Sequence, residues 1–174
     1  MSAAEEQVAI YDAEGNPVGA LPRARMRAEG RWHAAASVLL RSGDGRRVYV
    51  HRRTEDKDVY PGMHDCWAGG VLLAGEEPAA CARRELAEEL GVRDVPLTPL
   101  FRLPFVDGTI RYHAFTYEAR WDGPVIHQPE EVAEGGWMSL DDLRTRLADP
   151  TWPFTPDGRA LFHAWDRRQT GHGQ

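Results

Sequence analysis

The chain contains few cysteines and no long apolar run. Cys66 and Cys81 are its only thiols, too few for a disulfide framework, which favours a reducing compartment. No stretch approaches the roughly 18 consecutive apolar residues that a membrane-spanning helix needs, and no signal peptide stands at the N-terminus. We therefore expect a cytoplasmic protein with free thiols and no membrane partner.

Positive charge is also scarce. The sequence has 21 Lys and Arg against 27 Asp and Glu, a formal net charge of −6. Binding to duplex nucleic acid depends on a basic stripe that offsets the phosphate charge, and this chain has none. Its seven histidines are scattered, and none has a zinc-ligand spacing with either cysteine. These absences argue against a duplex-binding protein and against a structural zinc site.

What is present is the composition of one globular domain. Hydrophobic residues make up 42% of the chain and charged residues 28%, ordinary values for a protein with one sizeable core. Residues 1–7 are polar and are predicted to be flexible, and residues 8–170 are predicted to form a single domain.

The local patterns predict more strands than helices. Strands are expected at 8–11, 17–21, 33–40, 47–51, 97–106, 109–120 and 136–138, and helices at 78–90, 140–147 and 157–168. The first six strands should pair in chain order as three hairpins. This order predicts a mixed sheet packed between helices, of the α/β (α+β) class.

Three glutamates in the segment 70–92 carry the clearest functional signal. Glu85, Glu88 and Glu89, here called the box glutamates, stand at i, i+3 and i+4 and so share one face of a helix. Like charges at this spacing repel unless a cation lies among them. Oxygen ligands suit a hard ion such as Mg²⁺ or Mn²⁺. The alternative is a solvated acidic face.

The surroundings of this stripe favour a site. Pro78 suits the first helical turn and Gly91 the residue just after the last, which brackets the helix at 78–90. An apolar stripe beside the acids, formed by Ala79, Ala82, Leu86 and Leu90, gives the helix a core side. The box glutamates therefore lie at the border of the buried face, where a cleft can form.

The segment resembles the signature box of the Nudix hydrolases at every fixed position. Gly70 is followed after five residues by Glu76, and after seven more by the run Arg84-Glu85-Leu86-Ala87-Glu88-Glu89-Leu90-Gly91-Val92. Outside the box, the stretches 11–19, 32–35 and 51–62 are similar to the branch that contains isopentenyl-diphosphate isomerase and its bacterial hydrolase relatives.

The resemblance implies a MutT-like enzyme with the Nudix α/β/α sandwich, in which a mixed sheet lies between helices. It implies Mg²⁺-dependent hydrolysis of a small-molecule diphosphate joined to another group, with Mn²⁺ as a possible substitute ion. The box glutamates and the Gly70 carbonyl would hold the metal, with Glu88 and Glu89 catalytic, and Glu76 would pair with Arg84. The carboxylates must be ionised for this, as they ordinarily are at neutral pH.

Residues outside the box are further candidates. Glu131 is the candidate general base, with Glu130 and Glu134 as alternatives, although a metal-bound hydroxide can attack without a separate base. Three cations before the box are candidates for substrate contacts, with plain surface charges as the other reading: Arg52, Arg53 and Lys57. His33 resembles a metal-binding position of the isomerases, but a lone histidine on a strand is more often structural.

Two other functions are open but less favoured. In the isomerases a cysteine follows the Pro-Gly pair by seven residues, and here that position is Gly69, while Cys66 comes three residues too early. The hairpin segment 107–113 contains no glutamate, so both proton-transfer groups of the isomerase are missing. A non-catalytic nucleotide-sensing module would be expected to lose box carboxylates, and all of them are present. The substrate is not indicated by any pattern in the loops.

Overall fold

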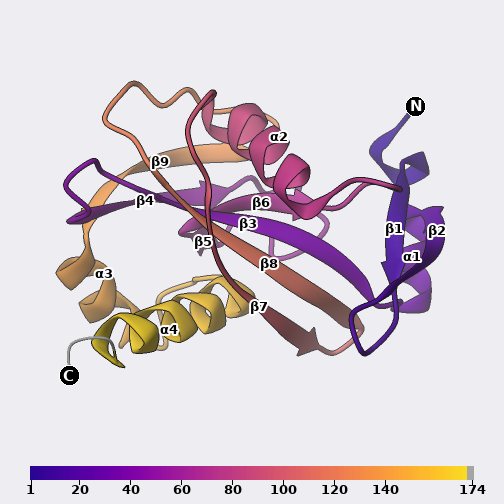
Figure 1. Cartoon of the computed structure of the whole chain (residues 1–174). Coiled ribbons are helices and arrows are strands. Elements are labelled where there is room, and N and C mark those ends of the chain that lie inside the picture. Colours follow the sequence, from indigo (N-terminus) through magenta and orange to yellow (C-terminus); the bar gives the residue numbers. More distant parts are fainter. Residues whose placement is uncertain (172–174) are drawn as a thin grey trace.

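The computed structural model describes residues 1–171, in which nine strands and four α-helices follow a 3-10 turn, η1 (Ala3–Glu5) (Figure 1). The strands are β1 (Gln7–Tyr11), β2 (Pro17–Pro22), β3 (His33–Arg41), β4 (Arg47–Arg53), β5 (His64–Asp65), β6 (Trp67–Val71), β7 (Thr98–Asp107), β8 (Ile110–Arg120) and β9 (Val132–Ser139). The helices are α1 (Arg23–Glu29), α2 (Pro78–Leu90), α3 (Leu140–Leu147) and α4 (Pro156–Gly171).

Strand β3 is the centre of a mixed sheet. It pairs antiparallel with β6 and parallel with β8, and β8 forms the expected hairpin with β7. The expected hairpin of β1 and β2 is also present. The expected antiparallel pairing of β3 with β4 is present, but its register covers only Arg41 and Val48. Most of β4 pairs with β9 and β5.

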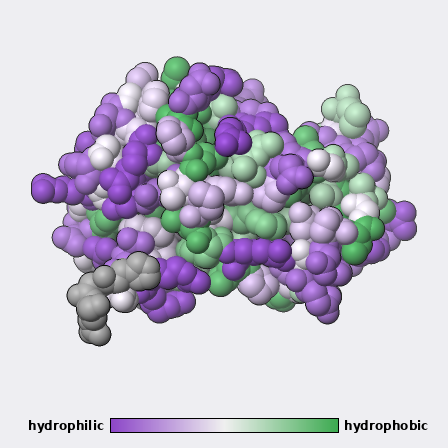
Figure 2. Space-filling model, in the orientation of Figure 1, coloured by the Kyte–Doolittle hydropathy of each residue, from purple (hydrophilic) through white to green (hydrophobic). Residues whose placement is uncertain are grey.

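Helices cover both faces of the sheet (Figure 1). Alternate residues of β3 point to opposite faces, so Ala36 and Val38 pack in the cluster that contains Leu86 of α2, whereas Leu39 packs in the cluster that contains Phe162 of α4. The predicted α/β/α arrangement with a mixed sheet is confirmed. Apolar and polar residues are interspersed on the face shown in Figure 2.

Capping residues set the helix ends where the sequence predicts them. Pro78 occupies the first turn of α2, and Gly91 ends it with a left-handed φ of 67°, a conformation that costs glycine little. Helix α2 therefore has the bounds 78–90 that its sequence indicates. Helix α3 likewise begins after the predicted cap, because the Ser139 side chain accepts from the Asp142 amide at 3.0 Å.

Besides the 3-10 turn η1, three elements were not expected from the sequence: α1, β5 and β6. Helix α1 is arginine-rich and buries Met26 alone, so it lacks the apolar periodicity that predicts a helix. Strand β6 contains Gly69 and Gly70, and glycine is unfavourable in strand interiors. The segment 1–7 contains η1, and its last residue, Gln7, begins β1. The flexibility of this segment stays a prediction. No helix among residues 1–171 is both long and apolar enough to cross a membrane.

Candidate active site

Helix α2 presents its acids at the border between its buried and exposed sides. Leu86 and Leu90 are buried against the sheet. Beside them the Glu85 side chain is 12% exposed and Glu89 is 6% exposed, whereas the Glu88 side chain is 47% exposed. Two of the box glutamates are therefore withdrawn from bulk water, and the third reaches into it.

The guanidinium of Arg84 lies among three carboxylates. Its Nε and Nη2 donate to the two oxygens of Glu76 at 2.8 and 2.9 Å, a forked pair. Its Nη1 donates to Glu85 at 2.8 Å and to Glu88 at 3.4 Å. Glu76 also accepts from the Leu73 amide at 3.1 Å. The pair of Glu76 and Arg84 thus ties the loop before α2 to the helix.

Burial perturbs two of the box glutamates. Desolvation raises the pKa of Glu89 well above its ordinary value, and the charge of Glu85 raises it further against the opposing effect of Lys57. Desolvation also raises the pKa of Glu85, an effect that Glu88 reinforces. Without a cation nearby, the environment of this pair therefore disfavours the charged forms. A cation among them would favour the charged forms.

A cavity of 640 Å³ opens beside the acidic stripe. The box glutamates line it together with Gly70, Lys57 and Glu131, and the Lys57 ammonium contacts the Glu131 carboxylate. A side chain at Gly70 would meet the Glu85 carboxylate at 2.5 Å. Glycine at this position therefore allows the β6 backbone and the Glu85 carboxylate to approach closely. Such an approach is needed if the Gly70 carbonyl and Glu85 are to bind the same metal ion.

The donor chemistry of the cavity fits a hard divalent ion. The available groups are carboxylate and carbonyl oxygens, the ligands that Mg²⁺ and Mn²⁺ prefer. Within residues 1–171, no three Asp, Glu, His or Cys side chains already converge on one point, and Arg84 is hydrogen-bonded to Glu85 and Glu88 instead. Glu85 and Glu89 are desolvated, and their negative charges repel each other. A bound cation would stabilise their charged forms, so this arrangement favours a metal site over a solvated acidic surface.

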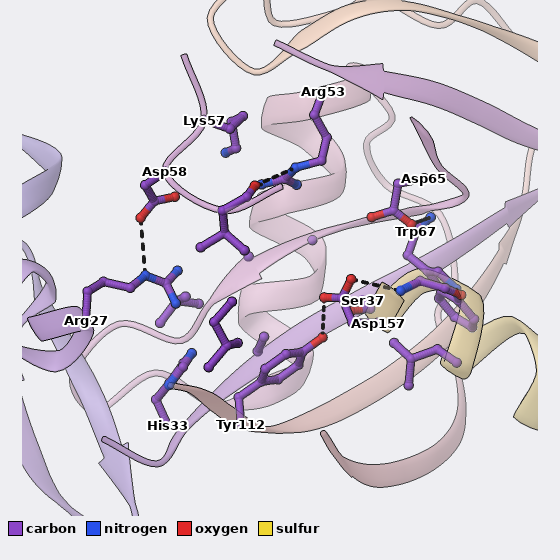
Figure 3. Close-up of a pocket in the computed structure, with 18 of the residues that line it drawn as sticks. Arg27, His33, Ser37, Arg53, Lys57, Asp58, Asp65, Trp67, Tyr112 and Asp157 are labelled. Atoms are coloured by element: carbon purple, nitrogen blue, oxygen red, sulfur yellow. Dashed lines mark hydrogen bonds and ion pairs between the residues drawn. The ribbon is translucent and has the colours of Figure 1, made fainter. Parts of the chain in front are cut away.

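A second cavity of 120 Å³ adjoins the first (Figure 3). Residues 69–71 line both cavities, and so do the side chains of Arg23, Arg27 and Lys57. Arg53 lines the second cavity, where its guanidinium donates to the Val59 carbonyl at 2.8 and 3.1 Å. Three cations thus lie at the junction between the two cavities, together with Asp58, which pairs with Arg27 at 3.2 Å.

Arg52 lies on the other side of β4. Its Nε donates to Glu134 at 3.0 Å, and both residues line a separate cavity with Trp137. Neighbouring residues of a strand point to opposite faces, which separates Arg52 from Arg53. The structure therefore brings Arg53, Lys57 and Glu131 toward the box glutamates, but not Arg52 or Glu134.

His33 and Cys66 are both buried. The His33 Nδ1 donates to the Arg31 carbonyl at 3.0 Å, and burial lowers its pKa to about 4, so the ring is neutral near pH 7. Cys66 packs in the core cluster that contains Trp165 of α4, and burial raises the pKa of its thiol. Cys66 therefore fills the core as an uncharged thiol.

Sequence reasoning missed the residues that reach the second cavity from distant segments. They come from α1, β5, β8 and α4, and are Arg23, Arg27, Asp65, Tyr112 and Asp157. One signal was available: Arg23 and Arg27 stand at i and i+4, a spacing that shares a helix face. No spacing in the sequence links Asp65 to Asp157.

A family model described as the NUDIX domain matches residues 31–158. The chain belongs to the Nudix family. Among its Nudix relatives, the uncharacterized hydrolase orf19 of Rhodococcus erythropolis is 48% identical over 172 residues, covering 93% of this chain and 92% of the relative. YfcD of Escherichia coli K12 is 34% identical over 166 residues, covering 95% and 89%. The crystal structure of DR0079 from Deinococcus radiodurans superposes with a TM-score of 0.77 at 25% identity, covering 91% and 98%.

As a Nudix hydrolase, the protein is an enzyme that cleaves pyrophosphate bonds, and members of this family generally use a divalent metal such as Mg²⁺. The Nudix α/β/α sandwich predicted from the box is confirmed. The isomerase is not favoured, because a side chain at Gly69 would overlap the Ala36 carbonyl. The non-catalytic module is not favoured either, since Glu85, Glu88 and Glu89 all line one cavity.

Proposed function

We propose that the box glutamates and the Gly70 carbonyl hold Mg²⁺, or Mn²⁺ in its place, for hydrolysis of a small-molecule diphosphate. The observation that carries this assignment is the burial of Glu85 and Glu89 beside one another with raised pKa values. A divalent ion bound there supplies charge neutralisation and activates a water molecule. Arg84 keeps Glu85 and Glu88 oriented through its pair with Glu76.

Glu131 is proposed to accept the proton of the attacking water. It lies across the cavity from α2, and its contact with Lys57 keeps it at the cavity wall. A base on a loop can approach the reacting atoms when substrate binds, so its distance in the free enzyme does not decide its role. Glu131 is preferred to Glu134 for this role, because Glu134 pairs with Arg52 at a separate cavity.

The cations at the junction of the two cavities are proposed to bind the diphosphate. Lys57, Arg23 and Arg27 line both spaces, and guanidinium groups bind phosphate oxygens in a forked geometry. Arg53 adds positive charge from the wall of the second cavity. These positive side chains and the acids of α2 line the same space. A diphosphate would therefore lie between the cations and the metal-binding carboxylates.

Turnover of box variants tests the proposal. Glu88→Gln and Glu89→Gln keep the side-chain shape but remove a charged ligand, and each should lower Mg²⁺-dependent turnover by orders of magnitude. Release of phosphate-containing products from a panel of diphosphates is the measurement. Glu77→Gln is the control, because it makes the same change at an exposed residue just before α2. Turnover close to wild type in both box variants at saturating Mg²⁺ would refute the assignment.

A further inference from the structure

We propose that the 120 Å³ cavity is the specificity pocket, and that it receives a hydroxyl- or amino-bearing group joined to the diphosphate, recognised by Asp65 and Asp157. The inference rests on the proposed function, because it takes the diphosphate to lie against the box glutamates. The two cavities share residues 69–71 and the cations at their junction. A substituent on a diphosphate bound there would point into the smaller space.

Two carboxylates line one side of this cavity: Asp65 is buried and Asp157 is half-buried. Figure 3 shows Asp65 and Asp157 on one side and Arg27 and Lys57 on the other. Asp157 accepts from the Tyr112 hydroxyl at 2.6 Å and, through its other oxygen, from the Gly158 amide at 2.9 Å. One side of the cavity is therefore acidic, whereas the other carries Arg27 and Lys57, with Asp58 hydrogen-bonded to Arg27 at 3.2 Å.

Asp65 lines this cavity from β5. It is 8% exposed, and its Oδ1 accepts from the Trp67 amide at 3.0 Å. A carboxyl group can accept several hydrogen bonds, so Asp65 has acceptor capacity beyond the Trp67 amide. A ligand group that donates hydrogen bonds would satisfy Asp65, and a hydrocarbon would not.

The size of the cavity limits the group. An apolar cavity of roughly 150 Å³ holds one benzene ring, so 120 Å³ suits a single sugar-sized ring or a short polar chain. Ile110 and Leu161 supply apolar walls, against which the carbon face of such a group can pack. The neutral ring of His33 adds no positive charge. An anionic group is disfavoured, because it would face Asp65 and Asp157.

Substrate selectivity and its loss in variants test the inference. We would measure kcat and KM with Mg²⁺ for ADP-ribose, UDP-glucose and isopentenyl diphosphate. Wild-type enzyme should favour the two hydroxyl-rich compounds over isopentenyl diphosphate by about tenfold or more in kcat/KM. Asp65→Asn, which replaces an acceptor oxygen with a donor, should raise KM for the preferred compounds by about tenfold while changing kcat far less.

Controls separate recognition from folding. Asp166→Asn makes the same change on α4 at a residue paired with Arg144 at 2.9 Å, and it should leave KM unchanged. Asp157→Asn provides a second test, should Asp65→Asn fail to fold. Equal use of isopentenyl diphosphate by wild type, or an unchanged KM in both cavity variants, would overturn the inference while diphosphate hydrolysis stands. Hydrolysis of none of these three compounds, nor of any other diphosphate in the panel, would instead reject the proposed function, and this inference with it.

Discussion

Glu131 lies across the cavity from the box glutamates, in contact with Lys57. If it is the general base, Glu131→Gln should lower kcat by about 10²–10⁴-fold and leave metal affinity little changed, because the side chain moves a proton and does not hold the ion. Steady-state kinetics at saturating Mg²⁺ is the measurement. Glu134→Gln is the matched control, since Glu134 pairs with Arg52 elsewhere.

Other outcomes of this series are equally informative. A loss of less than tenfold for Glu131→Gln with a collapse for Glu130→Gln would place the base at Glu130. Near-normal turnover in all three variants would mean that the box alone carries the chemistry, with a metal-bound hydroxide as nucleophile.

The protonation of Asp65 affects stability as well as recognition. Burial, reinforced by the charge of Asp157, raises its pKa from 3.8 to about 7, whereas in the unfolded chain the carboxyl titrates near pH 4. Between these values the folded state binds the extra proton, so the stability contributed by Asp65 falls as pH rises from about 4 to about 7. Asp65→Asn should therefore gain stability relative to wild type across that range.

Urea unfolding at pH 4.5 and pH 7.5 measures this difference. Asp166→Asn makes the same substitution at a residue whose side chain is 23% exposed, and it controls for the substitution itself. A stability difference between Asp65→Asn and wild type that is the same at both pH values would contradict the raised pKa.

The residues of the site differ in how far the sequence could predict them. The box glutamates could be grouped because they share one helix, whose spacing fixes which side chains are neighbours. Arg52 and Arg53 could not be told apart, because the choice of face depends on how β4 pairs with β9. Asp65 and Asp157 meet only through tertiary packing, which leaves no local signal.

At the scale of elements, the position of β6 against α2 is as important as the box helix. A Cβ at Gly70 would meet the Glu85 carboxylate, whereas a Cβ at Gly136 of β9 would meet nothing within 4 Å. Gly70→Ala should therefore displace Glu85 and lower Mg²⁺-dependent turnover by about tenfold or more, since small misplacements of catalytic groups are costly. Gly136→Ala should have little effect on the same assay, and an equal effect of both variants would contradict this account.

These two elements also show why some segments are predictable. Helix α2 has a proline at its start, a glycine after its end and an apolar stripe, so its bounds follow from local chemistry. Strand β6 is glycine-rich and is set by pairing with β3 over five residue pairs. Gly69 is required because the Ala36 carbonyl approaches its backbone closely, and Gly70 because the Glu85 carboxylate does. Neither partner is a neighbour in the sequence, so local patterns do not reveal these contacts.

At the scale of the whole molecule, the segment before the family match packs against the sheet. The family model begins at residue 31, yet Met26 of α1 packs with Val8, Ile10 and Val71. Strand β1 also contacts the loop between β6 and α2, because the Ala9 amide donates a hydrogen bond to the Leu72 carbonyl at 3.0 Å. This packing supports a domain that starts near residue 8, as the sequence predicts.

Truncation of Met26 tests this integration. Met26 is 1% exposed, so Met26→Ala should lower the free energy of unfolding by about 2–5 kcal/mol. Val18→Ala on β2, where the side chain is 59% exposed, should change it by about 0.5 kcal/mol or less. Urea unfolding measures both, and equal effects would indicate that the N-terminal segment is not part of the core.

The central claim is that α2 and β6 form a divalent-metal site. The most direct test is the dissociation constant of Mn²⁺, measured by electron paramagnetic resonance of the free ion. Removing one charged ligand should weaken binding by about tenfold or more, so we expect this for Glu85→Gln, Glu88→Gln and Glu89→Gln, with Glu77→Gln close to wild type. Mn²⁺ affinity that is unchanged in all three box variants would contradict the account.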